Sequence, residues 1–542
     1  MEDMLGEDNI IRGCDLQFEP NPGGLGVELF QKMKKNKYYT AQICALTGHR
    51  DTYGSLLQRS IRTAIEMQNR GVTREDVIAL CTYNQLNSAV PYVATFLVGA
   101  KVAALDPTIS FEDTKHLINQ VCPKLVFVVP ECKDMYEDVI SELALKTQII
   151  VFNDANDYDS ISFFLKPKEA ENDFRPVIAS SIHDTAIIFF SSGTTGLAKG
   201  ICINHYTIMG QAVNISVSGL ISNVVCSFAT FYWISSAMIF VQTVMKGHTR
   251  LICKFFTPKD AWELIEKYKV TQMFVAPSQA MAMMKHGKPE GLNTATLYDL
   301  MVGGGPMSSE NMMAFKDLFP GTNVGLVYGQ TEVAGLITIF KPAVRKDIIL
   351  MHSKPSSSGR PSFGMWFKVI DLETEEVLGP NRRGELRVKT KMQLNGYYNI
   401  PSDGIWDEDG WLKTGDVCYY DEDLCFYIVD RIKEMMKYQS WHIPPALLEG
   451  VLQQHPAVRT AVVFGVPHDE DGEHPMAVVV LMPDCQDVRE EELVEFVNCR
   501  VDNRQKIRAG IRFMDSIPLT PSGKVKRKAL KDFVLEEMKY RI

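Results

Sequence analysis

The sequence predicts an α/β protein: a large N-terminal domain of mixed sheets flanked by helices plus a β-rich part, and a small α+β C-terminal domain. Three observations predict this fold class. The chain has 542 residues, more than one compact domain usually holds. Short apolar runs alternate with helical patterns over most of its length. After about Gly384 the pattern becomes rich in strands, and we expect domains at residues 1–430 and 431–542.

Continuous apolar runs mark the strands expected in the large domain. Runs of this kind, separated by amphipathic helices, indicate mostly parallel sheets. In chain order we expect strands at 76–81, 101–105, 124–129, 148–152 and 186–190, with a helix over 88–97. The later elements are strands at 384–389, 417–420, 426–430, 458–466 and 476–482, and helices over 445–453 and 490–500.

The composition is that of an ordinary globular protein, with 46% hydrophobic and 23% charged residues. The formal net charge of −9, without a long basic run, gives no basis for nucleic-acid binding. The 12 cysteines are scattered and form no CxxC pair, which favours reduced thiols in an intracellular protein. The acidic N-terminus lacks an apolar signal region and the C-terminus lacks Ser-Lys-Leu, so we expect a cytoplasmic location by default.

One long span carries no charge: residues 200–245 contain no Asp, Glu, Lys or Arg. Its second half, 224–244, is apolar and long enough to cross a bilayer. Polar residues interrupt it, however, and the chain as a whole is not hydrophobic. We therefore expect this span to be buried in a large core and predict no membrane span.

A loop rich in glycine and hydroxyl groups follows the strand expected at 186–190. Its candidate phosphate-binding residues are Ser191, Ser192, Gly193, Thr194, Thr195 and Lys199. Glycine lets backbone N–H groups turn toward an anion, hydroxyls donate hydrogen bonds, and lysine neutralises charge. The loop is not a P-loop, because Ala198 precedes Lys199 and Gly200 follows it. The alternative is a surface turn, but the whole string favours phosphate binding.

With this loop and a series of later motifs, the chain resembles the adenylate-forming superfamily, and within it the insect luciferase-like acyl-CoA synthetases. The later motifs are Tyr-Gly-Gln-Thr-Glu at 328–332, Gly-Glu-Leu at 384–386, Gly-Tyr-Tyr at 396–398, Thr-Gly-Asp at 414–416, Asp-Arg-Ile-Lys at 430–433 and Pro-Leu-Thr-Pro-Ser-Gly-Lys at 518–524. The resemblance covers nearly the whole chain and implies that the small C-terminal domain is mobile.

The resemblance also implies roles for residues of the large domain. Tyr328, with Gly329, would stack near adenine, and Thr331 would contact the α-phosphate. Glu332 would hold Mg²⁺, a hard cation that prefers carboxylate and phosphate oxygens. A loop of Gly303, Gly304 and Gly305 would border adenine and the acyl group, where glycine permits close approach. Without the resemblance, a Thr-Glu pair is more often a helix cap than a metal site, and the glycine loop is equally a tight turn.

Further roles are implied near and beyond the predicted domain boundary. Asp416 would bind both ribose hydroxyls, which suits a carboxylate with two acceptor oxygens. Arg431 would reach the nucleotide, and Lys433 would be the hinge of the small domain. Lys437 would act in the second conformation of that domain. Lys524 would bridge the attacking carboxylate and the α-phosphate; the alternative is a solvated basic tail.

The function that the resemblance implies is ATP-dependent activation of a carboxylic acid to acyl-AMP, followed by thioesterification, with ATP, Mg²⁺ and coenzyme A as cofactors. We expect the partner to be a small-molecule carboxylic acid, since apolar residues of the uncharged span lie where the family builds its acyl pocket. A medium- or long-chain fatty acid is our hypothesis, and an aryl acid is the alternative. The candidate pocket residues, which equally suit core packing, are Phe228, Phe231, Tyr232, Trp233, Met238, Ile239 and Phe240.

Two departures from the family pattern define the alternatives. Luminescent beetle members carry His-His-Gly-Phe where this chain has Phe-Tyr-Trp-Ile-Ser at 231–235, which argues against a luciferase-type monooxygenase. Ser440 stands where the family usually has glycine, at the approach of the pantetheine chain of coenzyme A. The prediction of acyl-AMP formation is therefore better supported than the prediction of thioesterification. A catalytically silent acyl- or nucleotide-binding member is a further alternative, although the intact motif residues argue against it. An adenylation partner for a separate carrier protein is another.

Overall fold

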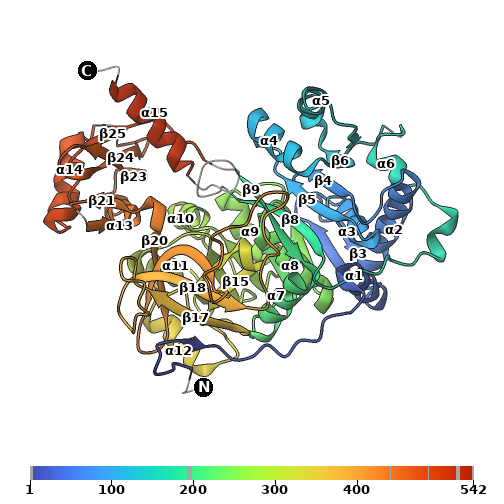
Figure 1. Ribbon diagram of the computed structural model, residues 1–542, viewed down its shortest axis with the longest axis horizontal. Helices are drawn as coiled ribbons and strands as arrows, with labels where there is room; N and C mark the ends of the chain where they lie inside the picture. The colour runs from blue at the N-terminus through green and yellow to red at the C-terminus, as the bar shows by residue number, and fades with distance from the viewer. Residues whose placement is uncertain are drawn as a thin grey trace. The chain divides into compact units, whose positions relative to one another are not determined.

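The structure is a computed structural model that describes residues 4–155, 157–191, 198–439, 441–485, 487–519 and 525–539 (Figure 1). It divides into two compact units, which we describe one at a time. The large unit comprises residues 1–305, 311–367 and 388–413, and the small unit comprises 306–310, 368–387 and 414–542. The predicted functional boundary next to Asp430 stays a prediction, because a hinge need not coincide with a division by packing.

A six-stranded sheet of the large unit confirms the predicted strands of the first half of the chain. Its neighbours are parallel except for the last pair, β8 and β9, and α4 and α5 bury one of its faces. Helix α4 begins at Ser110, whose hydroxyl accepts the Asp113 N–H. The strand order is β7 (Gln148–Val151), β6 (Leu125–Val128), β4 (Val77–Cys81), β5 (Lys101–Leu105), β8 (Thr185–Ser191) and β9 (Lys199–Asn204).

A nine-stranded sheet forms the second layer of the large unit. Its central strands, from β14 to β2 in the order below, are parallel, and antiparallel strands extend it at both edges. Parallel neighbours align their carboxyl ends along one edge, where functional loops can gather. The order is β16 (Arg360–Pro361), β15 (Gly335–Ile339), β14 (Asn323–Gln330), β13 (Asp299–Gly303), β12 (Gln272–Val275), β10 (Val224–Ser227), β11 (Thr249–Ile252), β2 (Thr40–Cys44) and β3 (Arg50–Thr52).

Helices connect most of these strands (Figure 1). They are α1 (Gly24–Lys35), α2 (Tyr53–Asn69), α3 (Ala89–Leu97), α4 (Phe111–Val121), α5 (Lys133–Glu142), α6 (Ile161–Phe164), α7 (His205–Val217), α8 (Ile234–Lys246), α9 (Pro258–Tyr268), α10 (Pro277–His286), α11 (Ser309–Asp317) and α12 (Arg345–Ser353). The remaining strands before the small C-terminal sheet are β1 (Ile11–Arg12), β17 (Met365–Ile370), β18 (Gly384–Thr390), β19 (Leu412–Tyr420) and β20 (Phe426–Arg431).

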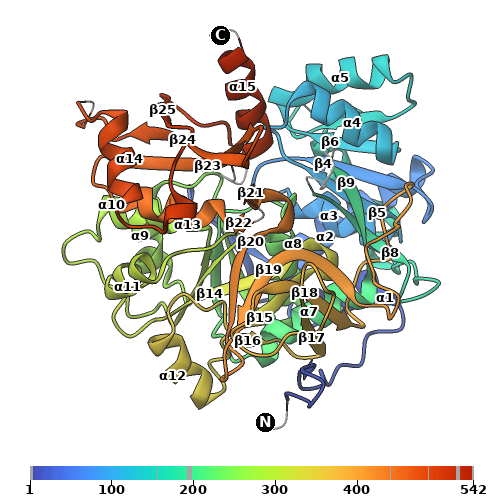
Figure 2. The same cartoon turned by 60° about the vertical axis from the view of Figure 1, so that its left-hand side comes forward.

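Side chains that alternate along the strands of the small unit's C-terminal sheet build two cores. Figure 2 shows the strands and helices of this part. On β23, Val463 packs with α13 and α14, whereas its neighbours Val462 and Phe464 pack with α15. The elements are β21 (Met436–Tyr438), β22 (Trp441–Ile443), α13 (Pro445–Gln453), β23 (Val458–His468), β24 (Gly472–Leu481), α14 (Glu490–Asn498), β25 (Ile511–Phe513) and α15 (Arg527–Lys539).

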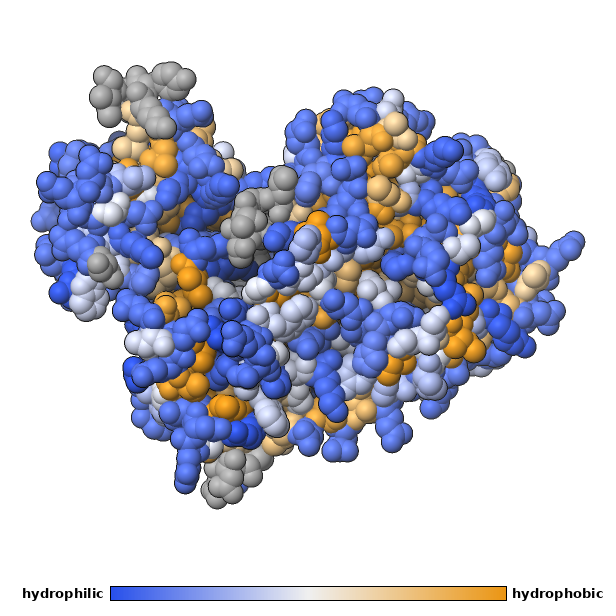
Figure 3. All heavy atoms as spheres, in the orientation of Figure 1, coloured by the Kyte–Doolittle hydropathy of each residue, from blue (hydrophilic) through white to orange (hydrophobic). Residues whose placement is uncertain are grey.

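The uncharged span 200–245 folds into four separate elements: the end of β9, then α7, β10 and α8. Most residues of both helices are buried, as predicted for a large core. Within the described residues, no helix is both long and apolar enough to cross a membrane. On the face shown in Figure 3, hydrophilic side chains predominate and apolar ones form small separate groups.

His205, the first residue of α7, makes stability depend on pH. It is buried, and its Nδ1 accepts a hydrogen bond from the Leu25 backbone N–H at 3.2 Å. Burial lowers the pKa of His205 from 6.5 to about 4, against a smaller opposing effect of Asp184. The unfolded chain therefore binds a proton in this range that the folded chain excludes. The contribution of His205 to stability is fully present above pH 6.5 and is lost as the pH falls toward 4.

We expect His205→Asn to flatten the acid side of the stability profile, because it removes the titrating ring but keeps an acceptor for the Leu25 N–H. The pH-dependent part of the unfolding free energy that this substitution removes is up to about 3 kcal/mol. Denaturant unfolding between about pH 4.5 and 7.5 measures it. His286→Asn, at an exposed histidine, should leave the wild-type slope unchanged. Parallel profiles for His205→Asn and the wild type would contradict the assignment.

Candidate active site

The predicted phosphate loop connects the two strands of a β-hairpin. Strands β8 and β9 pair antiparallel, with Ser191 opposite Lys199, so the segment between them leaves and re-enters the sheet at neighbouring positions. His116 on α4 makes a 2.8 Å hydrogen bond to the carbonyl of Ala198, and Gln120 accepts the Gly200 N–H at 3.2 Å. The base of the loop is therefore held by α4. Ser192, Gly193, Thr194 and Thr195 lie outside the described residues.

Lys199 contacts Tyr397 at the base of this hairpin. The Lys199 ammonium lies over the Tyr397 ring, 4.8 Å from its centroid, in a cation–π contact. Burial, and secondarily the negative charge of Glu332, raise the pKa of Tyr397. The aromatic ring thus holds a lysine that is able to neutralise the charge of a phosphate.

Backbone hydrogen bonds join the chain segments that carry Lys199, Glu332 and Tyr397. The Leu394 N–H donates to the carbonyl of Glu332 at 2.7 Å, and the Tyr398 N–H donates to the carbonyl of Gly200 at 2.7 Å. Tyr397 itself forms an isolated antiparallel bridge with Ile201 on β9. The segment 394–398 therefore joins the phosphate hairpin to the short 3₁₀ helix η3 (Thr331–Val333), which begins with Thr331 and Glu332.

The predicted adenine-binding segments lie at adjacent strand ends. Gly303 ends β13 and pairs with Val327 of the parallel strand β14, directly before Tyr328. Tyr328 is buried, whereas Gly304 and Gly305 are exposed. Position 329 accepts only glycine, because the Cβ of any other residue would lie 2.1 Å from the carbonyl oxygen of Gly335. The structure thus brings the glycine loop and the Tyr-Gly-Gln-Thr-Glu segment to one edge of the sheet.

Helices α7 and α8, from the uncharged span, flank the same segment. Gln211 on α7 donates to the carbonyls of Val333 and Leu336 at 2.8 and 3.1 Å. Met238 on α8 lies against Gly335, where an added Cβ would come within 2.3 Å of its sulfur. The two helices therefore pack against residues 333–336, which directly follow Thr331 and Glu332.

Some of the candidate pocket residues pack in the hydrophobic core instead. Phe231 stacks on Tyr92 with centroids 4.1 Å apart, and Phe240 contacts both rings edge-on. The buried guanidinium of Arg250 lies over Phe231 and Phe240, 4.9 and 5.1 Å from their centroids. Tyr232 and Trp233 stay half-buried. Of the seven predicted residues, Met238 is the one that the described contacts place against Gly335, three residues after Glu332.

In the small unit, Asp416 and Arg431 face each other across β19 and β20. They are register partners, with Arg431 Nε 3.5 Å from Asp416 Oδ1. Asp416 is buried, whereas the Arg431 side chain is 45% exposed. The Thr414 hydroxyl fixes the strand by donating to the Leu386 carbonyl at 2.6 Å and accepting the Asp416 N–H at 3.2 Å. A buried carboxylate and a reachable guanidinium thus form a polar pair suited to a ribose.

The predicted hinge, Lys433, lies directly after Arg431 and Ile432. Lys433 is exposed in the 3₁₀ helix η4 (Ile432–Glu434), and Lys437 is exposed on β21 with its N–H donating to Glu473 at 3.0 Å. Burial raises the pKa of Asp430 to about 6, although the Arg431 and Ala446 N–H groups donate to its carboxylate.

Lys524 and Ser440 lie outside the described residues, but both ends of the Lys524 loop are described. Leu519 and Val525 form an antiparallel bridge, and the Lys526 N–H donates to the Pro518 carbonyl at 2.9 Å. Arg527 then pairs with Glu434 at 3.1 Å and also with Glu449. The loop is therefore anchored on both sides within the small unit.

Sequence reasoning did not identify Tyr397 and His116 as site residues. Tyr397 was noted only as part of a motif, and His116 lies in a helix with no motif at all. The one available signal was the Gly-Tyr-Tyr motif itself. Contacts between segments this far apart in the chain cannot be read from local patterns.

Comparison with known proteins agrees with this geometry. The AMP-binding enzyme family profile matches residues 29–398, and the AMP-binding enzyme C-terminal domain profile matches residues 447–524. A luciferin 4-monooxygenase of Nipponoluciola cruciata is 30% identical over 98% of this chain and 99% of its own. The 4-coumarate–CoA ligase-like 9 of Arabidopsis thaliana is 30% identical over 89% of this chain and 85% of its own.

Solved structures give the same result. The luciferase-like enzyme from the nonluminescent mealworm Zophobas morio has 36% identity and a TM-score of 0.75, covering 79% of this chain and all of that one. ATP-bound MatB from Rhodopseudomonas palustris has 20% identity and a TM-score of 0.82, with 95% and 99% coverage, which shows the shared fold alone. The chain therefore belongs to the AMP-binding enzyme family, within the adenylate-forming superfamily.

Proposed function

We propose that the chain activates a small-molecule carboxylic acid with ATP and Mg²⁺ to an acyl-AMP, and then transfers the acyl group to coenzyme A. The observation that carries this proposal is the contact of Lys199 with Tyr397, together with the backbone hydrogen bonds that join the 394–398 segment to Gly200 and to Glu332. Two relatives, a luciferin 4-monooxygenase and the 4-coumarate–CoA ligase-like 9, support the proposed adenylation by sequence similarity over most of the chain.

In the first step, a carboxylate oxygen attacks the α-phosphorus of ATP, the bond to the bridging oxygen breaks, and pyrophosphate leaves. Lys199 neutralises phosphate charge and Thr331 contacts the α-phosphate. Lys524 stabilises the negative charge that develops as the new bond forms. Glu332 is a half-buried carboxylate. It fits Mg²⁺, which usually takes one or two protein carboxylates plus substrate phosphates and would neutralise those phosphates.

In the second step, the sulfur of coenzyme A attacks the acyl carbonyl carbon, the bond to the AMP oxygen breaks, and the thiol loses its proton. The predicted C-terminal domain, residues 431–542, would turn about Lys433 and bring Lys437 to the site. Both side chains are exposed and lie four residues apart along the chain, as a hinge and a second catalytic face require.

For the acid, we propose a medium- or long-chain fatty acid. What supports it is that the mostly apolar helices α7 and α8, from the uncharged span, pack against residues 333–336, directly after Thr331 and Glu332. An apolar chain needs such a dry surface. The commitment of Phe231 and Phe240 to the core limits the aromatic surface available to an aryl acid.

The test is carboxylate-dependent pyrophosphate release, with and without coenzyme A, over a panel of fatty, aryl and amino acids and luciferin. We expect release with fatty acids and an acyl-CoA product when coenzyme A is present. Release without thioester would locate the block at the second step, near Ser440. Light emission with luciferin would favour a luciferase-type monooxygenase, and no release with any acid would favour a silent binding member.

Asp416→Asn should raise the KM for ATP about tenfold or more with a smaller change in kcat, because a charged hydrogen bond to the ribose is lost. A sharper readout is the preference for ATP over 2′-deoxy-ATP, which should shrink in the variant. Asp403→Asn, at an exposed aspartate, is the control. An unchanged preference would remove Asp416 from ribose binding.

A further inference from the structure

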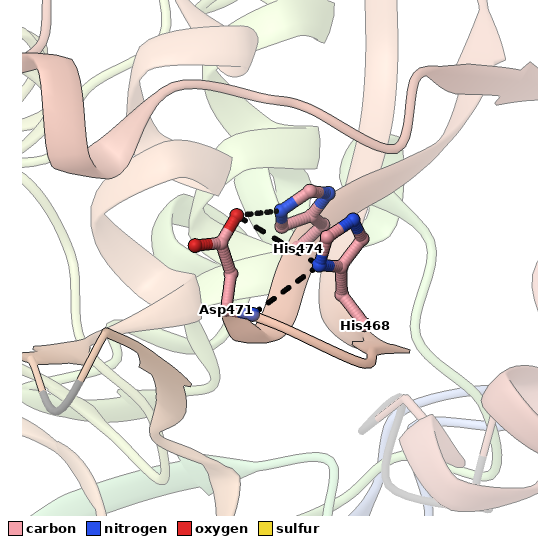
Figure 4. A group of neighbouring side chains, drawn as sticks. All are labelled: His468, Asp471 and His474. Atoms are coloured by element: carbon pink, nitrogen blue, oxygen red, sulfur yellow. Dashed lines mark hydrogen bonds and ion pairs between the residues drawn. The ribbon is translucent and has the colours of Figure 1, made fainter.

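Two histidines and an aspartate meet at the turn between β23 and β24. His468 ends β23, Asp471 lies in the turn, and His474 lies on β24 opposite Val466. The two imidazole rings stack with centroids 3.8 Å apart and 19° between their planes. Figure 4 shows contacts from Asp471 to both rings. Nothing in the proposed adenylation chemistry uses these three side chains.

Their ligand atoms converge. His474 Nε2 lies 2.8 Å and His468 Nδ1 lies 3.8 Å from Asp471 Oδ2, and the three ligand atoms all lie within 4.8 Å of one another. In a tetrahedral zinc site, bonds of about 2.0–2.1 Å place the ligand atoms about 3.3 Å apart. Small side-chain rotations therefore suffice to enclose an ion, with the Asp471 N–H, 3.3 Å from His468 Nδ1, released to solvent.

The donor set selects the class of ion. Two imidazole nitrogens and one carboxylate oxygen suit zinc and its neighbours, whereas magnesium and calcium prefer oxygen ligands alone. The side chains of His474, Asp471 and His468 are 17%, 21% and 40% exposed, so they are partly shielded and still reachable from solvent. Three protein ligands leave a position for water.

The cluster also has outer partners, as metal sites require. Asp471 uses its second carboxylate oxygen to accept from the Gln439 amide at 2.6 Å, and its carbonyl accepts the Gln439 N–H at 2.8 Å. Tyr438 pairs with Gly472, which also pairs with His468. Such outer contacts orient the ligands of a metal. They tie the turn to the segment that directly follows Lys437.

We propose that His468, Asp471 and His474 bind one divalent transition-metal ion of the zinc class, which fastens the β23–β24 turn to the 438–439 segment. The site is separate from the Mg²⁺ proposed at Glu332, and it stands whether or not the chain forms acyl-AMP.

Cobalt titration of the chelator-treated full chain, in the absence of nucleotide, tests the proposal. We expect one Co²⁺ per chain with visible d–d absorption and no thiolate charge-transfer band, and displacement by Zn²⁺. His468→Ala and His474→Ala should each weaken binding at least about tenfold, since even outer partners of a metal contribute that much. His455→Ala is the matched control, because His455 Nδ1 also accepts a backbone N–H at 3.3 Å, from Ala457.

Thermal unfolding provides a second readout that does not depend on colour. Zn²⁺ should raise the melting temperature of the wild type and of His455→Ala, because a ligand that binds the folded state stabilises it. Asp471→Asn, which keeps an acceptor for Gln439, should lose most of this shift. Wild-type cobalt affinity in His474→Ala, a thiolate band in the wild type, or equal shifts in Asp471→Asn and wild type would each overturn the proposal.

Discussion

Lys524→Ala should slow acyl-AMP formation at least about a hundredfold, because removing a group aimed at developing transition-state charge typically has such an effect. The described residues on both sides of the loop that contains Lys524 are fixed by hydrogen bonds and ion pairs. Leu519 and Val525 close the loop at its base, and Arg527 is fixed by Glu434 and Glu449. The loop thus starts and ends at anchored points of the small unit.

The measurement is single-turnover pyrophosphate release with saturating ATP and acid. Lys528→Ala is the control, since Lys528 is exposed on α15 only four positions along the chain. When purified acyl-AMP is supplied with coenzyme A, the Lys524→Ala protein should still form thioester, because the first step is bypassed. Unchanged turnover from ATP would remove Lys524 from the mechanism.

Asp347→Ala should destabilise the large unit by about 3–5 kcal/mol, the usual result of breaking a buried ion pair from one side. Asp347, on α12, is fully buried between two cations. Arg360 NH1 lies 2.9 Å and Lys341 Nζ lies 3.5 Å from its carboxylate oxygens, and the Lys341 N–H donates to it at 3.0 Å. Alanine would leave both cations buried without the carboxylate.

Denaturant unfolding measures the loss of unfolding free energy, and hydrogen exchange in β15 and β16 shows where in the structure it occurs. Asp8→Ala is the matched control, because Asp8 pairs with Arg12 at 2.6 Å on the surface, where solvent screens such pairs and they contribute little to stability. A loss no larger than that of the control would show that the network adds little. Because Thr338 on β15 pairs with Tyr328 on β14, we also expect weaker ATP binding in Asp347→Ala.

Local patterns predicted the elements whose signals are local. The helix expected at 445–453 is α13 with the same bounds, since Pro445 can start a helix and the apolar periodicity continues to its end. The strand expected at 76–81 is β4 (Val77–Cys81), a run buried on both faces. By contrast, β14 escaped prediction, because Gly325 and Gly329 interrupt its strand pattern.

The site was predicted as a set of motifs but not as a geometry. Lys199 and Glu332 were named from their motifs, yet the contact of Lys199 with Tyr397 follows only from the fold. Likewise, no pattern predicts that Phe231 and Phe240 enclose the buried Arg250 rather than line a pocket. Whether an apolar side chain faces a ligand or the core depends on packing between distant segments.

The nine-stranded sheet also determines when the protein can fold as it leaves the ribosome. Strand β2 is completed by β11, and 208 residues separate Gln42 from its partner residue Arg250. At roughly 5–20 residues per second, β11 emerges on the order of 10–40 s after β2. During this interval β2 can pair with the short strand β3, but its other edge has no partner and Ala41 and Ile43 have no central sheet to join. The nascent chain therefore presents an apolar strand with one open edge early, which makes it a natural client for chaperones that act during synthesis.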